Sequence, residues 1–412
     1  IDSETKSQII PWIVFLFSIS IILISFISVI FPALIQASDT VKIPGIQSVT
    51  PDPYEIGVWS GGTIVTSIIV FSLVFLHHKK KIPSLSRLFE KIFAFEISKK
   101  TTLIIMIVLL GIYISVSVTE LTTQEDFEDY ALVKERLDEA IRDNRWTIED
   151  AINGNPNYPT FEPHVRYTLL LASEKIFGNL KVIPFLASIA LLITTYLITT
   201  IITQKRFAGI VSTVILLQSS VFLAYDTTVS YTNFWILFYL ISLYTIYRFW
   251  PLSPIAYLIS IPAKSLTILF LPMSIYFILK SNISKNKKIV IAGSMTSIII
   301  IISIVAASGI SSGQVAEEFN SKEFWMGFTS FAYQLRFDGL IMLFLIPLIV
   351  GLFIASKKGI KHAESFMILI AGILLIAPIL TGFTNQTNQP YRFVPLVVFF
   401  AIGVGILLSK KS

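Results

Sequence analysis

The chain has 412 residues, of which 54% are hydrophobic and 14% are charged, and its mean hydropathy is +0.75. A soluble domain cannot bury that much apolar surface, so the composition indicates that a bilayer is the solvent for most of the chain. The absence of cysteine excludes disulfides, thiolate metal sites and a cysteine nucleophile. The net charge of +6 does not indicate nucleic-acid binding, because the basic residues lie in short loops between apolar runs, where they set orientation.

Apolar runs recur along the whole sequence and are continuous rather than alternating, which predicts helices and argues against a barrel. Each span needs roughly 20 residues. Ten full spans are predicted, near 9–35, 56–76, 102–118, 182–202, 207–224, 232–247, 289–307, 338–355, 364–381 and 392–409. The segment 252–279 contains several prolines and Lys264, and predicts a broken or re-entrant pair of short helices.

Lysine and arginine in the short loops predict which side of the membrane each loop occupies. The loop 77–101 holds seven of them and is predicted to be cytoplasmic. All the other basic clusters fall on the same side if 252–279 enters the membrane and returns as a hairpin. The sequence then predicts a multi-pass protein of the cell membrane with cytoplasmic termini and an extracytoplasmic loop at 119–181.

The loop 119–181 is the largest and holds 13 acidic residues against 7 lysines or arginines. Helical spacing predicts an amphipathic helix over Glu125–Arg145 and a second helix over His164–Phe177, which would form a small helical extracytoplasmic subdomain. The apolar stripe of the first helix is Tyr130, Leu132, Val133, Leu137 and Ile141. On the other side, Ser84–Ile97 is predicted to be a helix lying on the membrane surface.

Five carboxylates lie within residues 120–129, at the membrane end of this loop. A carboxylate near low dielectric can have a raised pKa and act as a general base. Two neighbouring carboxylates could instead hold a divalent cation. A third interpretation is a solvated acidic start of a helix, where acids are favoured, and charge content alone favours this one.

The order of segments around this cluster resembles a known family. An apolar span is followed by Asp126-Phe-Glu-Asp-Tyr130, then Asp143-Asn-Arg-Trp146, the proline-rich Asn157–Tyr167, and Lys175-Ile-Phe-Gly178. Later come Ile261-Pro-Ala-Lys264-Ser and Gln389-Pro-Tyr-Arg-Phe-Val-Pro395. This arrangement resembles the GT-C glycosyltransferases, especially the protein mannosyltransferase and aminoarabinose transferase branch (family 39). The resemblance covers about 100–409, so the predicted division is an N-terminal hairpin with its basic loop at 1–101 and a GT-C-like membrane core at 102–409.

The resemblance implies that an acid of the first outer loop is the base that activates the acceptor. The matching residue is Asp126, with Glu128 and Asp129 as alternatives, while Tyr130 and Tyr167 would position the reacting groups. The resemblance also implies a sugar donor on polyprenyl phosphate, whose phosphate would be bound by Arg166, His164, Lys264 or Arg392. Each of these four has a plainer interpretation as an interface or snorkelling residue. Glu162 stands where one branch of the family has lysine, which leaves the phosphate contact open.

The expected function is transfer of a single sugar from polyprenyl phosphate to a hydroxyl of an acceptor protein, glycan or lipid. No protein-bound cofactor is assigned, and a divalent cation is left open. The expected partners are membrane lipid, the lipid-linked donor, the acceptor and a membrane partner at the N-terminal hairpin, with no nucleic acid. The alternatives are a transporter or lipid flippase, and a non-catalytic subunit of a membrane complex that binds through 119–181 or the first hairpin.

Overall fold

The computed structural model describes residues 3–34, 52–79, 81, 83–142, 163–307, 318–384 and 390–409. Every regular element in these residues is a helix, which confirms the all-α prediction. Within them, eight helices are long and apolar enough to cross a bilayer. They are α1 (Ser3–Ile30), α2 (Ser60–His78), α4 (Lys99–Ser117), α8 (Val182–Thr203), α14 (Lys285–Ala307), α17 (Gly339–Lys357), α18 (Ala363–Thr384) and α19 (Val394–Leu407). The span that contains α19 also includes the preceding 3₁₀ turn, so it covers the 18 residues Pro390–Leu407.

Two of the ten predicted spans form shorter helices. The run near 207–224 breaks into α9 (Arg206–Leu217) and α10 (Ser220–Ala224), because the Ser219 hydroxyl accepts the Phe222 backbone N–H and begins a new helix. The run near 232–247 is α11 (Phe234–Arg248). Its 15 residues extend about 22 Å, less than the roughly 30 Å of a hydrocarbon core. The described residues therefore contain eight helices of spanning length where the sequence predicted ten.

The segment 252–279 forms two short helices with a break between them, as predicted. α12 (Leu252–Ala263) ends at Lys264, which is extended, and η2 (Ser265–Phe270) leads into α13 (Leu271–Lys280). The Lys280 ammonium forms an ion pair with Glu364 at 2.5 Å, at the start of α18. Lys264 instead lies beside Tyr391, before the start of α19. The break at Lys264 thus lies at the opposite end of α13 from Lys280.

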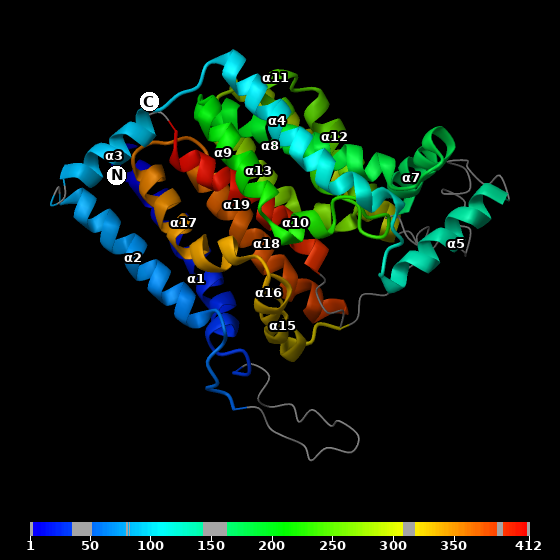
Figure 1. The fold of residues 1–412 in the computed structure, drawn as a ribbon, viewed down its shortest axis with the longest axis horizontal. Coiled ribbons are helices and arrows are strands. Elements are labelled where there is room, and N and C mark those ends of the chain that lie inside the picture. Colours follow the sequence, from blue (N-terminus) through cyan, green and yellow to red (C-terminus); the bar gives the residue numbers. More distant parts are fainter. Residues whose placement is uncertain are drawn as a thin grey trace.

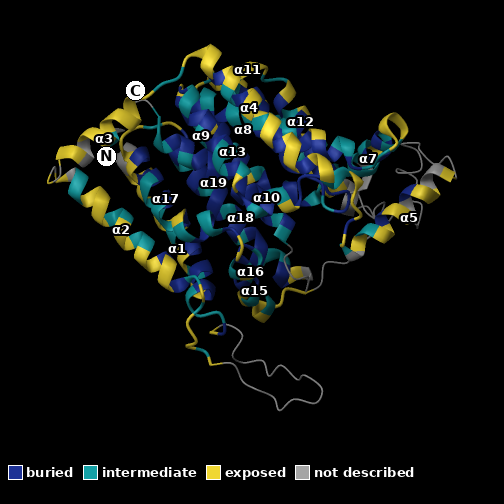
Figure 2. Ribbon diagram, in the orientation of Figure 1, coloured by how far each residue is buried: buried dark blue, intermediate teal, exposed yellow. Residues whose placement is uncertain are grey.

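The main core includes α8, α11, α18 and α19, whose side chains are mostly buried, while α2 and α4 present mostly exposed side chains (Figure 2). The first helix belongs to this core. In α1, Phe15 stacks on Phe353 with ring centroids 4.3 Å apart, and Phe26 contacts Phe331 at 5.1 Å. In the described residues α1 thus packs against α16, α17 and α18.

The helices of the acidic loop lie at one end of the bundle, at the right of Figure 1. α5 (Glu128–Arg142) and α7 (Pro163–Phe177) share a second, smaller apolar cluster of Val133, Leu137, Leu170, Leu171 and Val229. The predicted stripe of α5 is correct for Val133 and Leu137 and wrong for Leu132, which is 46% exposed. The remaining short helices are η1 (Val118–Thr122), α3 (Pro83–Ala94), α15 (Ser321–Gly327), α16 (Thr329–Gln334) and η3 (Pro390–Phe393).

Gly405 lets α19 approach α8 and α9 closely, as small residues do between membrane helices. A Cβ atom on Gly405 would lie 2.3 Å from the Ser212 hydroxyl and 2.5 Å from a methyl carbon of Thr199. We expect Gly405→Ala to destabilise the fold by about 1–3 kcal/mol, the usual range for overpacking. Gly111 has nothing within 4 Å of the same position and supplies the control, because Gly111→Ala should be neutral or slightly stabilising. Thermal unfolding in detergent measures both, and equal midpoints for the two variants would contradict this packing.

Candidate functional site

The loop of residues 225–233, between α10 and α11, is the point where the acidic segment meets the membrane helices. We call it the central loop. Glu125 anchors it: one carboxylate oxygen accepts the Val229 backbone N–H at 2.5 Å, and the other accepts the Ser230 N–H at 3.2 Å and the Ser230 hydroxyl at 2.8 Å. Glu120 accepts the Thr227 hydroxyl at 2.8 Å. Glu125 is only 8% exposed, so it is a structural carboxylate.

Asp126 lies between two anchored neighbours. Glu125 is fixed as described, and the Phe127 ring stacks on Tyr225 with centroids 5.6 Å apart and an interplanar angle of 18°. The Asp126 side chain is exposed, and it makes no hydrogen bond or ion pair within the described residues. A carboxylate held in place by its neighbours and not engaged itself is suited to accept a proton from a substrate.

Asp129 connects the acidic segment to two cations through two tyrosines. The Tyr231 hydroxyl donates to Asp129 at 2.6 Å, and the Tyr231 ring stacks on Tyr391 with centroids 4.2 Å apart. The Tyr391 hydroxyl accepts from Lys264 Nζ at 3.4 Å and from Arg392 Nε at 3.3 Å. The two cations therefore donate to the same phenol oxygen, and the stacked pair Tyr231–Tyr391 connects them to the Asp129 carboxylate. We call residues Asp126, Asp129, Tyr231, Lys264, Tyr391 and Arg392 the convergence site.

Tyr231 of this site remains protonated. Burial, and then the hydrogen bond to Asp129, raise the pKa of Tyr231 well above its usual value. Burial also raises the pKa of Tyr225, to about 12. Tyr231 is therefore a hydrogen-bond donor to Asp129 at every physiological pH, and the carboxylate is the acceptor.

Arg166, Tyr130 and Tyr167 lie beside this site rather than within it. Arg166 donates to the Ser230 carbonyl at 3.0 Å and to Tyr167 at 3.5 Å, so it supports the central loop from the α7 side. Tyr130 and Tyr167 pack against the small apolar cluster shared by α5 and α7. The side chains of Glu128 and His164 lie outside the described residues, as do the segments 143–146 and 157–162 that contribute to the family resemblance.

Asp226 is a member of the central loop that the sequence did not single out. Its side chain is 1% exposed; one oxygen accepts the Ser117 hydroxyl at 2.8 Å, and the other has no hydrogen-bond partner within the described residues. Burial raises its pKa to about 6. The sequence signal available was a lone acid in a short Ser/Thr-rich stretch between two apolar runs, which resembles an ordinary loop.

The raised pKa of Asp226 predicts a pH dependence of stability. Between pH 4 and 6 the folded protein holds a proton that the unfolded chain releases, so stability should fall as pH rises through this window, by roughly 3 kcal/mol in total. Asp226→Asn should remove that slope and raise the unfolding temperature at pH 7. Thermal unfolding of both proteins in detergent across pH 4–7 measures this, and parallel curves would contradict it.

The anchoring role of Glu125 predicts the behaviour of the central loop. In Glu125→Ala, the Val229 and Ser230 N–H groups lose a charged acceptor, which usually contributes about 1.5–3 kcal/mol. Their hydrogen exchange should accelerate by roughly tenfold or more. Glu135→Ala, on the exposed face of α5, is the control and should leave these amides unchanged. Unchanged protection of residues 229 and 230 in Glu125→Ala would show that the loop is held by other contacts.

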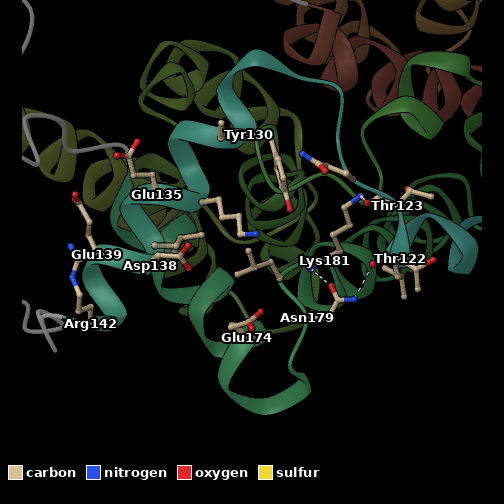
Figure 3. Close-up of a pocket in the computed structure, with 16 residues that line it drawn as sticks. Thr122, Thr123, Tyr130, Glu135, Asp138, Glu139, Arg142, Glu174, Asn179 and Lys181 are labelled. Atoms are coloured by element: carbon tan, nitrogen blue, oxygen red, sulfur yellow. Dashed lines mark hydrogen bonds between the residues drawn. The ribbon is translucent and has the colours of Figure 1, made fainter.

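A polar cavity of about 750 Å³ lies between α5, η1 and the turn from α7 to α8 (Figure 3). Lys181 crosses its wall and donates to the carbonyls of Glu120 at 3.0 Å and Thr123 at 2.7 Å. Glu135, Asp138 and Glu174 also line it, whereas Asp126 and Lys264 do not. The cavity borders the acidic segment but is distinct from the convergence site.

Within the described residues there is no group of three or more histidine and acidic side chains arranged to hold a metal ion. Comparison of the chain with models of known protein families, with curated proteins and with solved structures found no match. The chemistry of the convergence site is therefore the basis for a functional assignment.

Proposed function

We propose that the chain is a membrane glycosyltransferase that moves a single sugar from a polyprenyl-phosphate donor to an acceptor hydroxyl at the outer face of the membrane. The observation that supports this most is the stack of Tyr231 on Tyr391, which joins Asp129 of the acidic segment to Lys264 and Arg392. Such a reaction needs a base and a phosphate-binding cation at a membrane boundary. Asp126, the proposed base, precedes Asp129 by three residues in the same acidic segment.

The proposed donor lies with its phosphate against Lys264 and Arg392. Lys264 interrupts an apolar segment, where a charge is costly unless it meets a partner or a polar chamber. Ammonium and guanidinium groups form short, charge-assisted hydrogen bonds to phosphate oxygens. A prenyl chain on the donor would remain in the bilayer beside the helices.

In the proposed reaction Asp126 accepts the proton of the acceptor hydroxyl. The hydroxyl oxygen forms a bond to the anomeric carbon as the bond from that carbon to the phosphate oxygen breaks. Polyprenyl phosphate leaves with the bonding electron pair, and its charge is stabilised by Lys264 and Arg392. This single displacement inverts the anomeric centre. Asp129 holds Tyr231 in position, and Tyr231 stacks on Tyr391, whose hydroxyl accepts from the proposed phosphate-binding residues Lys264 and Arg392.

This proposal places the central loop and residues 119–181 outside the cell and both termini in the cytoplasm. The α1–α2 hairpin then provides the surface for a membrane partner. A lipid flippase is the second candidate, because the broken segment α12–η2–α13 with a lysine at its break is also typical of transporters. A flippase would move the lipid between leaflets without breaking the sugar–phosphate bond.

The experiment that separates these functions uses the full chain reconstituted in vesicles with labelled polyprenyl-phosphate hexoses and pentoses and a cell-envelope extract as the acceptor source. The proposal expects release of polyprenyl phosphate and transfer of label for at least one donor. Movement of intact donor between leaflets without cleavage would establish the flippase. If no donor is cleaved and none moves between leaflets, both the transferase and the flippase are contradicted. A non-catalytic subunit of a membrane complex is then the remaining function.

A further inference from the structure

A second polar cavity lies at the other end of the same helices. Its volume is about 600 Å³, and it forms where α8 ends, α9 begins and α11 ends. α8 begins at Val182, beside the acidic segment, and its 22 residues extend roughly 30 Å, so this cavity lies toward the opposite end of α8 from the acidic segment. Three tyrosines line the cavity, Tyr196, Tyr244 and Tyr247, and its charged lining residues are Glu96, Arg206 and Arg248.

The charges in this cavity favour an anion. Glu96 is the only carboxylate of the lining; one of its oxygens accepts the Arg206 backbone N–H at 3.0 Å, and the other is buried without a hydrogen-bond partner within the described residues. The lining therefore holds two guanidinium groups against one carboxylate. The Arg206 guanidinium uses one nitrogen for the Ile97 carbonyl at 3.4 Å. Arg248 is exposed, and its guanidinium makes no hydrogen bond or ion pair within the described residues. Two guanidinium groups from different helices therefore retain free N–H donors toward one cavity.

The surroundings of the cavity indicate that it lies at the level of lipid headgroups. The amphipathic helix α3 ends just before Glu96, and the Phe95 ring packs edge-on against Phe207 with centroids 4.8 Å apart. The buried Lys205 ammonium donates to the Phe93 carbonyl and fixes the end of α3 to the corner between α8 and α9. A helix with one apolar and one charged face lies in the membrane interface, which is also where tyrosine side chains gather.

The structure assigns this cavity as a binding site for the phosphate of an anionic phospholipid, held by Arg248 and Arg206. Arginine forks match phosphate oxygens bidentately, and basic pockets between membrane helices are typical sites for anionic headgroups. The site lies at the far end of the bundle from the convergence site, so it does not depend on the proposed transferase activity. It would tie the corner of α8, α9 and α11 to the lipid leaflet.

The test uses the full chain purified in a neutral detergent and titrated calorimetrically with short-chain phosphatidylglycerol. Glycerol phosphate serves as the soluble anion, and short-chain phosphatidylcholine serves as the lipid without net charge. We expect saturable binding of phosphatidylglycerol that is stronger than that of the other two. Arg248→Gln should weaken this binding by roughly tenfold, and Arg248→Lys should weaken it less.

Arg87→Gln is the matched control, because Arg87 is an exposed arginine of α3 outside the cavity. It should bind phosphatidylglycerol as the original protein does. Arg248 is exposed, so the thermal midpoint of Arg248→Gln without lipid should be unchanged. Equal affinity of Arg248→Gln and the original protein for phosphatidylglycerol would overturn the site. If glycerol phosphate and phosphatidylglycerol bound equally well, and Arg248→Gln weakened the binding of both, the assignment to a lipid would be overturned.

Discussion

Replacing Asp126 by asparagine is expected to lower the rate of sugar transfer by at least about a hundredfold. A positioned general base contributes roughly 10²–10⁴ to a rate, and asparagine cannot accept the proton of the acceptor hydroxyl. Asp126 is exposed and makes no hydrogen bond or ion pair within the described residues, so the substitution should leave the unfolding temperature unchanged. The measurement is kcat for release of polyprenyl phosphate with saturating donor, alongside thermal unfolding of the same sample.

Two comparisons make this result specific. Asp129→Asn keeps a side-chain oxygen that accepts the Tyr231 hydroxyl. The rate of sugar transfer should therefore fall much less in Asp129→Asn than in Asp126→Asn. Glu55→Gln changes an exposed acid in the segment between α1 and α2 and should have no effect. If Asp129→Asn lost as much activity as Asp126→Asn or more, the base would be Asp129, and the assignment of Asp126 would be wrong.

Replacing Lys264 by methionine is expected to weaken use of the donor. The substitution keeps a long apolar side chain and removes the ammonium group, so one charge-assisted hydrogen bond to phosphate is lost. We expect kcat/KM for the donor to fall by roughly tenfold to a hundredfold, through a higher KM because Lys264 binds the donor phosphate, and through a lower kcat because it stabilises the leaving phosphate. Lys264→Arg retains the positive charge, so its kcat/KM for the donor should fall much less.

A double-mutant cycle with Arg392→Gln shows whether the two cations hold the same group. Both donate to the Tyr391 hydroxyl, so their effects on donor KM should be coupled rather than additive. Lys287→Met, an exposed lysine at the start of α14, is the control and should change nothing. A lower unfolding temperature for Lys264→Met with an unchanged donor KM would identify Lys264 as a structural residue of the broken segment.

Local patterns were sufficient to predict most helices. Run length and period predicted eight of the ten spans and the short helices α3, α5 and α7, because these signals depend on neighbouring residues. Most of their ends were predicted to within a few residues, but the first span was predicted at 9–35, whereas α1 is Ser3–Ile30. The predicted span near 207–224 failed for a tertiary reason. The hydroxyl of Ser219 begins α10 and donates to Asp338 at 2.5 Å, a partner 119 residues away.

The site was predictable in part. The sequence indicated Asp126, Asp129, Lys264 and Arg392, and the structure brings Asp129, Lys264 and Arg392 together through Tyr231 and Tyr391. The two tyrosines are 160 residues apart in sequence, so no local pattern shows that they stack. The anchoring role of Glu125 depends on the central loop more than a hundred residues later, which is why five adjacent carboxylates looked equivalent in the sequence.

Photo-crosslinking with a diazirine-bearing polyprenyl phosphate tests the convergence site most directly. The reagent is added to the full chain in vesicles, and the modified peptides are mapped by mass spectrometry. We expect labelling at the central loop and at residues 390–393, and we expect Lys264→Met combined with Arg392→Gln to abolish it. Labelling confined to the Arg206 and Arg248 end of the bundle, with residues 225–233 and 390–393 unmodified, would contradict the proposal that the acidic segment and these cations receive a prenyl phosphate.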